Sequence, residues 1–448
     1  INVAAGTYVE NIAITKSLNI LGPNAAIDPN TGSRVTEAIV VPASVQTSLQ
    51  GSTSGTIFRL GTTSHIDVTI KGLTIDGHNP NLAGGRTLNG VAVHTGAGIT
   101  NSIGSFDANP GGRDVKMTIQ NNIIKNLERY GVLADGVTPA VALAGTDVSH
   151  NKIDNLPSGN NFGGGRGRGI AFEENHYGSA TYNVITRVNV GWQDDNYYLA
   201  SPGAGTLIDN NTISTYHRGI FHNLQYSNAT AATISNNSIS AATTGDFSAS
   251  TTNFGVELAS IQSAVGATVT NNNSSGNVYG ILLWNMPTTA NIAVTGGTLS
   301  NNTYGVYATN YDPQFADGSS SHAIISGVTI NGATAAGVYV EDNPLHATSA
   351  TFNLTVNNDC EIIGTGQTLT GVLVKGADAS ATVEDNDASI HGFAIGIDVD
   401  EFTRLTHAPD AVETYEFVDE IVEGGDVATL PPERRMHDDG RRTEILGR

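Results

Sequence analysis

Acidic, imidazole and guanidinium side chains gather in one stretch of the sequence, between residues 129 and 222. Two carboxyl groups held close together can act as a general acid and a base, because crowding raises the pKa of one while the other stays ionised. A neighbouring imidazole or guanidinium group can complete such a site. We therefore predict that the catalytic residues are Asp135, Glu173, Asp194, Asp195, His217 and Arg218.

A repeat that begins with glycine carries these side chains. Pentads of the pattern Gly-apolar-x-apolar-x recur along the chain, as in Gly131-Val-Leu-Ala-Asp135 and Gly169-Ile-Ala-Phe-Glu173. Alternation with a period of two predicts β-strands. A second register of asparagines interleaves one for one with the glycine register from Asn122 to Gly305, as two strands of the same coil must. The asparagine amides are expected to bond up and down a stack of coils.

The opening of the chain resembles a known fold. Gly6-Thr-Tyr-Val-Glu10, followed by Lys16-Ser-Leu-Asn-Ile-Leu-Gly22, resembles the first coils of right-handed parallel β-helix proteins, including pectin methylesterases and bacterial β-helix-repeat surface proteins. Together with the repeat, this predicts an all-β chain that forms a single-stranded right-handed parallel β-helix, a solenoid with an Asn ladder. We expect the helix to cover residues 1–400 and a charged, irregular tail or cap to cover 401–448.

Strand alternation assigns the pentad positions to two faces. The first and third residues after each glycine are mostly apolar and are expected to point inward, so the second and fourth point outward. Coils stack about 4.8 Å apart, so the fourth position forms a column. The column is predicted to run His94, Asp135, Glu173, Asp195 and Asn223. Three stacked carboxylates repel one another and tend to hold a proton or a cation.

The inward third position is polar in two coils, at Asp194 and His222. Either the strand register slips by one residue there, or the two side chains form a buried pair. We expect further residues to contact a substrate. Some lie near the column, and others lie at outward positions of later pentads. The predicted substrate-binding residues are Arg168, His176, Trp192, His222, Glu257 and Trp284.

The spacing of the column favours cleavage of glycosidic bonds. Glu173 and Asp195 on adjacent coils would lie about 5 Å apart, which suits a retaining glycosidase, whereas Asp135 and Asp195 would lie about 10 Å apart, at the outer limit of an inverting pair. The succession of Glu173, the Asp194-Asp195 pair and His217 resembles polygalacturonases, whose Asn-Thr-Asp, Asp-Asp and Gly-His-Gly elements follow on successive coils. Here Glu173 replaces the first Asp, His217 lacks a preceding Gly, and no Arg-Ile-Lys follows before Val374.

Other chemistries fit parts of the same stretch. In β-helix polysaccharide lyases an Arg or Lys removes a proton and calcium neutralises the substrate acid. That resemblance implies Arg187 or Arg218 as base and Asp135, Glu173 and Asp195 as ligands of a possible calcium ion. Gly191-Trp-Gln-Asp194 is similar to the Gln-Asp-Thr element of pectin methylesterases. A noncatalytic surface adhesin is a further alternative. Outward acids are common on the surface of acidic proteins, and Tyr307 and Tyr339 could simply pack against each other on neighbouring strands.

Composition excludes several functions and favours an exported protein. The net charge of −21 argues against binding nucleic acid or an anionic membrane. No apolar run approaches the ~20 residues of a membrane span. The chain has one cysteine, Cys360, and is rich in Asn, Thr and Gly, which is typical of secreted or cell-surface bacterial proteins. We expect a monomer that binds a polysaccharide, either neutral or anionic, and a chain that is a piece of a longer exported protein.

Overall fold

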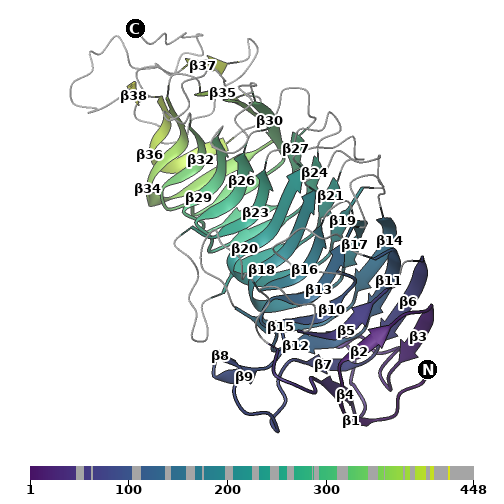
Figure 1. The fold of residues 1–448 in the computed structure, drawn as a ribbon. Coiled ribbons are helices and arrows are strands. Elements are labelled where there is room, and N and C mark those ends of the chain that lie inside the picture. Colours follow the sequence, from purple (N-terminus) through teal and green to yellow (C-terminus); the bar gives the residue numbers. More distant parts are fainter. Residues whose placement is uncertain are drawn as a thin grey trace. The chain divides into compact units, whose positions relative to one another are not determined.

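A computed structural model gives the structure of the chain (Figure 1). It describes residues 1–46, 55–61, 64–102, 113–136, 143–157, 167–173, 176–196, 205–224, 232–242, 252–259, 267–284, 286, 292–309, 321–341, 352–357, 359–376, 379–383, 389–399, 404–407 and 422–423. Every regular element within these residues is a β-strand. None of them belongs to a helix long and apolar enough to cross a membrane.

The chain divides into two compact units, and each is a parallel β-helix. The first consists of Ile1–Thr233 and Asn237–Ser250, the second of Ile234–Asn236 and Thr251–Arg448, and β21 (Ala232–Ser235) contributes residues to both. In each unit one coil supplies a strand to each of three parallel stacks, which we call stacks A, B and C. The predicted fold class, an all-β parallel β-helix, is therefore confirmed.

The first unit builds its three stacks from the strands before residue 242. Stack A consists of β3 (Leu18–Leu21), β6 (Ile66–Lys71), β11 (Val115–Gln120), β14 (Leu143–Ser149), β17 (His176–Thr181) and β19 (Leu207–Asp209). Stack B consists of β1 (Gly6–Val9), β4 (Ala38–Val41), β7 (Thr74–Asp76), β12 (Ile123–Lys125), β15 (Lys152–Leu156), the first parts of β18 (Val184–Asn196) and β20 (Thr212–Leu224), and β22 (Ser238–Ala241). Stack C consists of β2 (Ile12–Ile14), β5 (Thr56–Leu60), β10 (Ala97–Thr100), β13 (Tyr130–Asp135), β16 (Arg168–Glu173) and the second parts of β18 and β20.

The second unit repeats this plan. Its stack A consists of β24 (Ala267–Thr270), β27 (Ile292–Thr295), β30 (Ser321–Ser326), β33 (Phe352–Val356), β35 (Ala379–Val383) and β37 (Arg404–His407). Its stack B consists of β25 (Asn273–Ser275), β28 (Thr298–Ser300), β31 (Thr329–Asn331) and the first parts of β34 (Glu361–Lys375) and β36 (Ser389–Val399). Its stack C consists of β23 (Phe254–Ala259), β26 (Tyr279–Trp284), β29 (Tyr304–Thr309), β32 (Ala336–Glu341), the second parts of β34 and β36, and β38 (Val422–Glu423).

The core of each unit lies between its stacks. In β6 and β11 the burial alternates residue by residue, with Ile66, Val68 and Ile70 turned inward and the residues between them turned toward solvent. The period of two in the sequence produces this alternation directly. Stack C is buried on both faces through β13, where all six residues are buried, so its strands show less contrast between inside and outside.

The glycine that opens each pentad lies where stack B turns into stack C. A Cβ built on Gly131 would come within 2.4 Å of the carbonyl oxygen of Gly169, and one on Gly169 within 2.7 Å of the oxygen of Gly191. A side chain there would clash with the backbone of the next coil. The recurring glycine is therefore required by the close approach of neighbouring coils.

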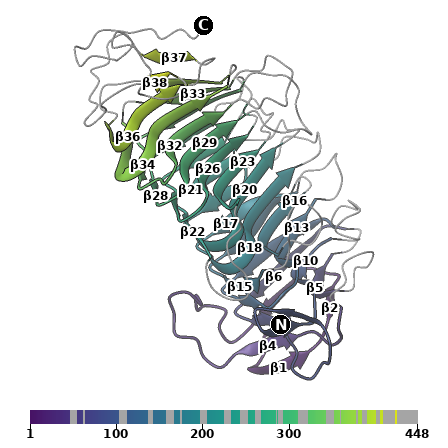
Figure 2. The ribbon, with the colours of Figure 1, turned by 90° about the vertical axis from the view of Figure 1, so that its left-hand side faces the viewer.

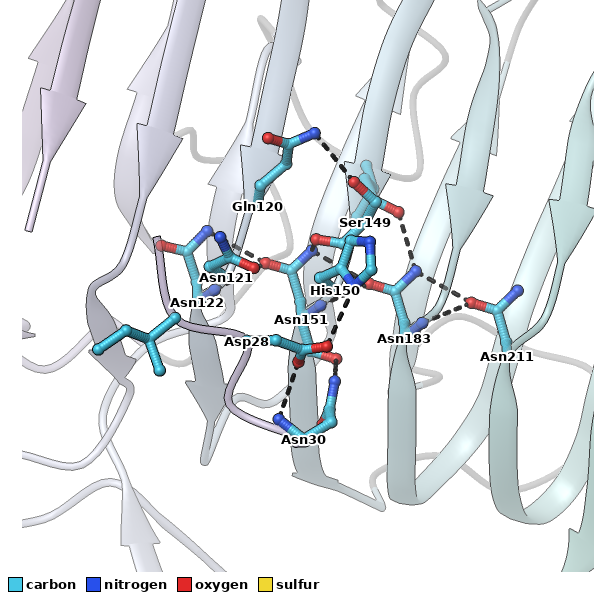
Figure 3. A network of polar contacts seen from close by, with 12 residues as sticks. Asp28, Asn30, Gln120, Asn121, Asn122, Ser149, His150, Asn151, Asn183 and Asn211 are labelled. Carbon is cyan, nitrogen blue, oxygen red and sulfur yellow. Dashed lines mark hydrogen bonds and ion pairs between the residues drawn. The ribbon is translucent and has the colours of Figure 1, made fainter. Parts of the chain in front are cut away.

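The predicted Asn ladder is present in the first unit (Figure 3). In the series Asn122, Asn151, Asn183, Asn211 and Asn237, each of the first four donates an amide hydrogen to the side-chain oxygen of the next, over 2.9 to 3.1 Å. The residue before each rung has a positive φ, between 54° and 57° from Asn121 to Asn236. Figure 3 also shows Asp28 and Asn30 of the loop after β3 lying against this turn.

Two sequence predictions need correction or extension. Gly90 does not open a coil: with Asn89 it forms the turn of an antiparallel hairpin between β8 (Arg86–Leu88) and β9 (Val91–Val93). An Asn-Gly pair with positive φ at both residues favours this turn.

At the C-terminal end, β37 and β38 pair in parallel with β35 and β36, so the pairing includes residues after Asp400. The domain boundary itself stays a prediction, because the rest of 401–448 lies outside the described residues.

Candidate functional site

The acidic column of the sequence is reproduced in stack C of the first unit. Asp135 of β13 pairs with Glu173 of β16, Glu173 pairs with Asp195 of β18, and Asp195 pairs with Asn223 of β20. These strands follow one another side by side in Figures 1 and 2. The side chain of Asp195 lies outside the described residues, so its backbone position alone is known. The head of the column differs, because Ser102 and not His94 stands beside Asp135.

Glu173 has a side chain that is 18% exposed and surrounded by donors. The guanidinium of Arg168 places Nη1 3.2 Å from Glu173 Oε1, and the amide of Gln193 on the next strand donates to the same oxygen over 3.3 Å. Arg168 also donates to the hydroxyl of Tyr130, and its guanidinium lies 5.0 Å from the centre of that ring. Glu173 is thus held as a hydrogen-bond acceptor at the surface.

Asp135 occupies a different environment one coil away. Its backbone is fixed by Asn101, whose side chain accepts from Asp135 N and donates to Asp135 O, both over 2.8 Å. The residue is 5% exposed, and Oδ1 makes no hydrogen bond within the described part of the chain. Burial, and next the charge of Glu173, raise the pKa of the Asp135 carboxyl to about 7. Asp135 therefore holds a proton at mildly acidic pH.

Asp194 and His222 form a buried pair, and the register does not slip. The pairing of β18 with β20 is continuous from Val190 to Asn196. Asp194 Oδ2 lies 3.0 Å from His222 Nδ1, and the two side chains are 1% and 0% exposed. Trp192, fully buried on the same strand, packs edge-on against Phe172 at 4.3 Å. The pair lies on the inner side of the strands that carry Glu173 and Asp195, among aromatic rings.

Three of the predicted substrate residues in the first unit are therefore interior residues. Trp192, His222 and His176 are each 0% exposed, so they have no surface to offer a polysaccharide. His176 Nε2 lies 2.7 Å from the hydroxyl of Thr146, and burial lowers the pKa of His176 to about 4. The alternation of the pentads already placed Trp192 and His222 at inward positions, whereas His176 lies outside the pentads and its burial came only from the structure. Of the predicted substrate residues, Arg168 does lie beside Glu173.

His217 and Arg218 lie in β20 and are 5% and 4% exposed. Arg218 pairs with Val190, which in turn pairs with Arg168, so both arginines stand in one row directly before the glycines. The guanidinium of Arg218 lies 4.4 Å from the centre of the Phe221 ring. Arg168 lies 3.2 Å from Glu173 Oε1, as described above.

Glu257 and Trp284 belong to the second unit. Glu257 is fully buried in β23 and pairs with Leu282. Trp284 ends β26 and lies edge-on to Phe254, with the ring centres 6.4 Å apart. Both therefore take part in the packing of stack C in that unit.

Two further predictions concern a lyase and a metal ion. Arg187 forms an ion pair with Asp154, in which Nε donates to Oδ1 over 2.8 Å, and this raises the pKa of Arg187. A guanidinium held as a cation in this way is a poor base.

No cluster of three metal-ligating side chains occurs within the described residues, and the side chain of Asp195 is outside them. The calcium site at Asp135, Glu173 and Asp195 stays a prediction.

Sequence reasoning missed Tyr130, Gln193 and Ser102 as members of the site. Tyr130 and Arg168 stand in the row directly before the pentad glycines, and Gln193 is the second residue after Gly191, at the first of the two outward positions. Extending each pentad by one residue toward the N-terminus would have shown Tyr130, Arg168 and Arg218 as one row. Ser102 was hidden because the Gly90 pentad replaced the true coil at Gly98.

Comparison with known proteins yields two similar solved structures. No family model matches the chain, and no curated protein matches it. One structure is the catalytic unit of a thermostable GH87 alpha-1,3-glucanase from Streptomyces thermodiastaticus strain HF3-3, at 12% identity and a TM-score of 0.44, covering 96% of this chain and 65% of that one. The other is the catalytic domain of a GH87 alpha-1,3-glucanase in complex with tetrasaccharides, at 14% identity and a TM-score of 0.35, covering 80% and 64%. The chain thus spans less than two thirds of either structure. The roles proposed below rest on the residues of this chain alone.

Proposed function

We propose that this protein is a secreted glycoside hydrolase that cleaves a polysaccharide through the carboxyl groups of Asp135 and Glu173. One observation carries the proposal: two carboxyl groups occupy paired positions on adjacent coils but have unlike surroundings. Asp135 is buried and its pKa is raised to about 7, whereas Glu173 is half-buried and faces two donors. A protonated and an ionised carboxyl group side by side is the arrangement that glycosidic cleavage requires.

Asp135 is the proposed general acid. Its carboxyl proton passes to the glycosidic oxygen as the bond to the anomeric carbon breaks, which lets the leaving sugar depart as an alcohol. An acid whose pKa lies near the operating pH can both hold and release this proton. The pKa of the Asp135 carboxyl group, about 7, lies in that range.

Glu173 is the proposed nucleophile. Paired positions on adjacent coils lie about 4.8 Å apart, close to the separation of about 5 to 5.5 Å in retaining enzymes. The Glu173 carboxylate attacks the anomeric carbon and forms a glycosyl ester. Water then hydrolyses the ester, with Asp135 now accepting the water proton. Arg168 and Gln193 orient the carboxylate through Oε1.

The remaining properties are proposals of the same kind. We infer a monomer that is secreted or displayed at a bacterial cell surface, in keeping with its composition, and that needs no cofactor for hydrolysis. Calcium ligation is less well supported than hydrolysis, because the Arg168 cation already lies 3.2 Å from Glu173. Elimination is less well supported because Arg187 is engaged with Asp154.

A panel of neutral and anionic polysaccharides tests the proposal. New reducing ends without ultraviolet absorbance from an unsaturated product are the expected result. If both signals appear together the reaction is an elimination, and the proposal is wrong. If neither appears on any polysaccharide, the alternative of a noncatalytic surface protein replaces it. Proton NMR of the first product then reports the anomer, and retention of configuration is expected.

A further inference from the structure

Four tyrosines form a continuous cluster on stack C of the second unit. Tyr279 and Tyr304 are paired positions of β26 and β29, and Tyr307 and Tyr339 are paired positions of β29 and β32. We call these four residues the tyrosine stack. Their ring centres lie 4.9 to 5.4 Å apart from each ring to its nearest partners. Phe254 continues the row on β23, at 5.2 Å from Tyr279.

The tyrosine stack lies on the outer side of its strands. Val306 and Val338, which alternate with Tyr307 and Tyr339, are 0% exposed and fill the core, and Tyr279 and Tyr304 stand directly before the glycines of their strands. Tyr279, Tyr304 and Tyr307 are half-buried, so part of each ring reaches the surface. The rings of Tyr304 and its neighbours Tyr279 and Tyr339 are stacked, with both pairs of ring centres 5.4 Å apart.

The hydroxyls of the stack are of two kinds. Tyr307 donates to the carboxylate of Glu341 on the neighbouring strand. Tyr279 and Tyr304 have no hydrogen-bond partner for their hydroxyls among the residues that the structure describes. Burial raises the pKa of Tyr279, so its hydroxyl stays protonated and able to donate. Adjacent coils present these two hydroxyls at intervals of about 4.8 Å, the spacing of the strands.

The charge around the stack restricts its ligand. The sequence contains no Lys or Arg from Phe221 to Val374, whereas Glu341 and Glu361 are among its acids. A polyanion would meet repulsion and no counter-charge there. A neutral polyol meets neither, and it can both donate to and accept from tyrosine hydroxyls while its C–H groups contact the ring edges.

We propose that the tyrosine stack is a noncatalytic binding site for a neutral polysaccharide chain that lies across strands β23 to β32. Successive sugar units of an extended glycan advance by about one coil, so neighbouring units can meet the hydroxyls of Tyr279 and Tyr304 in turn. Each hydroxyl exchanges hydrogen bonds with a sugar hydroxyl. The site is separate in residues from Asp135 and Glu173, and it needs no hydrolysis.

The test is affinity electrophoresis of the full chain in gels containing dextran, laminarin, xyloglucan or polygalacturonate. The protein carries Glu173→Gln, so that the polysaccharide is not consumed. The probe variant adds Tyr279→Phe and Tyr304→Phe, which keep the rings and remove the two hydroxyls. The matched control adds Tyr182→Phe, a half-exposed tyrosine of the first unit that stacks on His150 at 5.0 Å.

Retardation by at least one neutral polysaccharide is expected, with a loss of affinity of about tenfold in the double Phe variant, since each neutral hydrogen bond is worth about 0.5 to 1.5 kcal/mol. The control should bind as before, and all melting temperatures should agree. The proposal is overturned if no neutral polysaccharide retards the protein, if polygalacturonate alone does, or if the double Phe variant binds as tightly as its parent. Because binding is read without turnover, its failure leaves the hydrolase proposal untouched.

Discussion

The site depends on how two neighbouring carboxyl groups are solvated. Asp135 and Glu173 are one strand apart, yet Asp135 is 5% exposed and the Glu173 side chain 18%. Burial favours the neutral form of the Asp135 carboxyl group, whereas the Glu173 carboxylate faces a guanidinium and an amide. Like charges at this spacing repel, so protonating one of the pair relieves the other.

Asp135 should make the stability of the protein depend on pH. Its pKa in the folded state, about 7, lies above the ordinary value of 3.8, so the folded state binds the proton more tightly. The free energy of unfolding should therefore fall as pH rises between about 4 and 7, by a few kcal/mol at most. Asp135→Asn should melt at about the same temperature as the wild type at pH 4.5 and at a higher temperature at pH 8.

Thermal melts of the two proteins across that range check the prediction. Glu10→Gln, which alters an exposed acid directly after β1, serves as the control and should follow the wild type. If the melting temperature of Asp135→Asn runs parallel to that of the wild type from pH 4.5 to 8, the pKa of Asp135 is not raised in the folded state, and the prediction is wrong.

At the scale of residues, the sequence predicted the acidic column but not how far water reaches each of its carboxyl groups. The pentads aligned Asp135, Glu173 and Asp195 correctly because a period of two fixes which residues share a face. They could not show which outward positions other parts of the chain cover, so the burial of Asp135 came only from the structure. The inward turn of Trp192 and His222 was available from the same alternation, since they hold the first and third pentad positions.

At the scale of elements, the Asn ladder links successive coils at one turn. Asn183 accepts from Asn151 N and donates to Asn211 Oδ1 and Val148 O. Asn183→Ala would remove these partners from Asn151 N and Val148 O, whereas Asn211 Oδ1 would still accept from the backbone N–H of residue 183. Each such group costs about 1 to 3 kcal/mol, so we expect the variant to lose at least about 2 kcal/mol of stability.

Urea unfolding measures this loss, with Thr212→Ala as the control. Thr212 follows the next rung and is exposed, so its truncation should change stability by less than about 0.5 kcal/mol. Equal effects of the two substitutions would show that the ladder does not stabilise the coils.

Elements were predictable where the repeat is regular and were missed where another local signal intervened. The ladder and the glycine strands follow from side chains that must repeat with each coil. The Gly90 pentad fits the same pattern, but Asn89-Gly90 is a stronger signal for a tight hairpin, and both residues have positive φ. Turn chemistry therefore overrides the repeat at that point.

At the scale of the whole molecule, the chain carries 42 acidic and 21 basic residues, a net charge of −21. Self-repulsion of this charge destabilises the folded state and is screened by salt. We expect the melting temperature to rise as NaCl increases from about 0.01 to 0.3 M, where the Debye length falls below about 10 Å. A falling melting temperature would show that attractive ion pairs dominate.

The same net charge predicts that duplex DNA does not retard the protein in gel electrophoresis at either salt concentration.

The central claim is that Asp135 and Glu173 perform the cleavage. Initial rates on a polysaccharide that the wild type degrades should be compared for Asp135→Asn, Glu173→Gln and the exposed control Asp67→Asn, with circular dichroism to establish folding. We predict that each of the first two loses about 10²-fold to 10⁴-fold in rate, while the control retains wild-type activity. A folded Glu173→Gln variant that cleaves at the wild-type rate would contradict the claim.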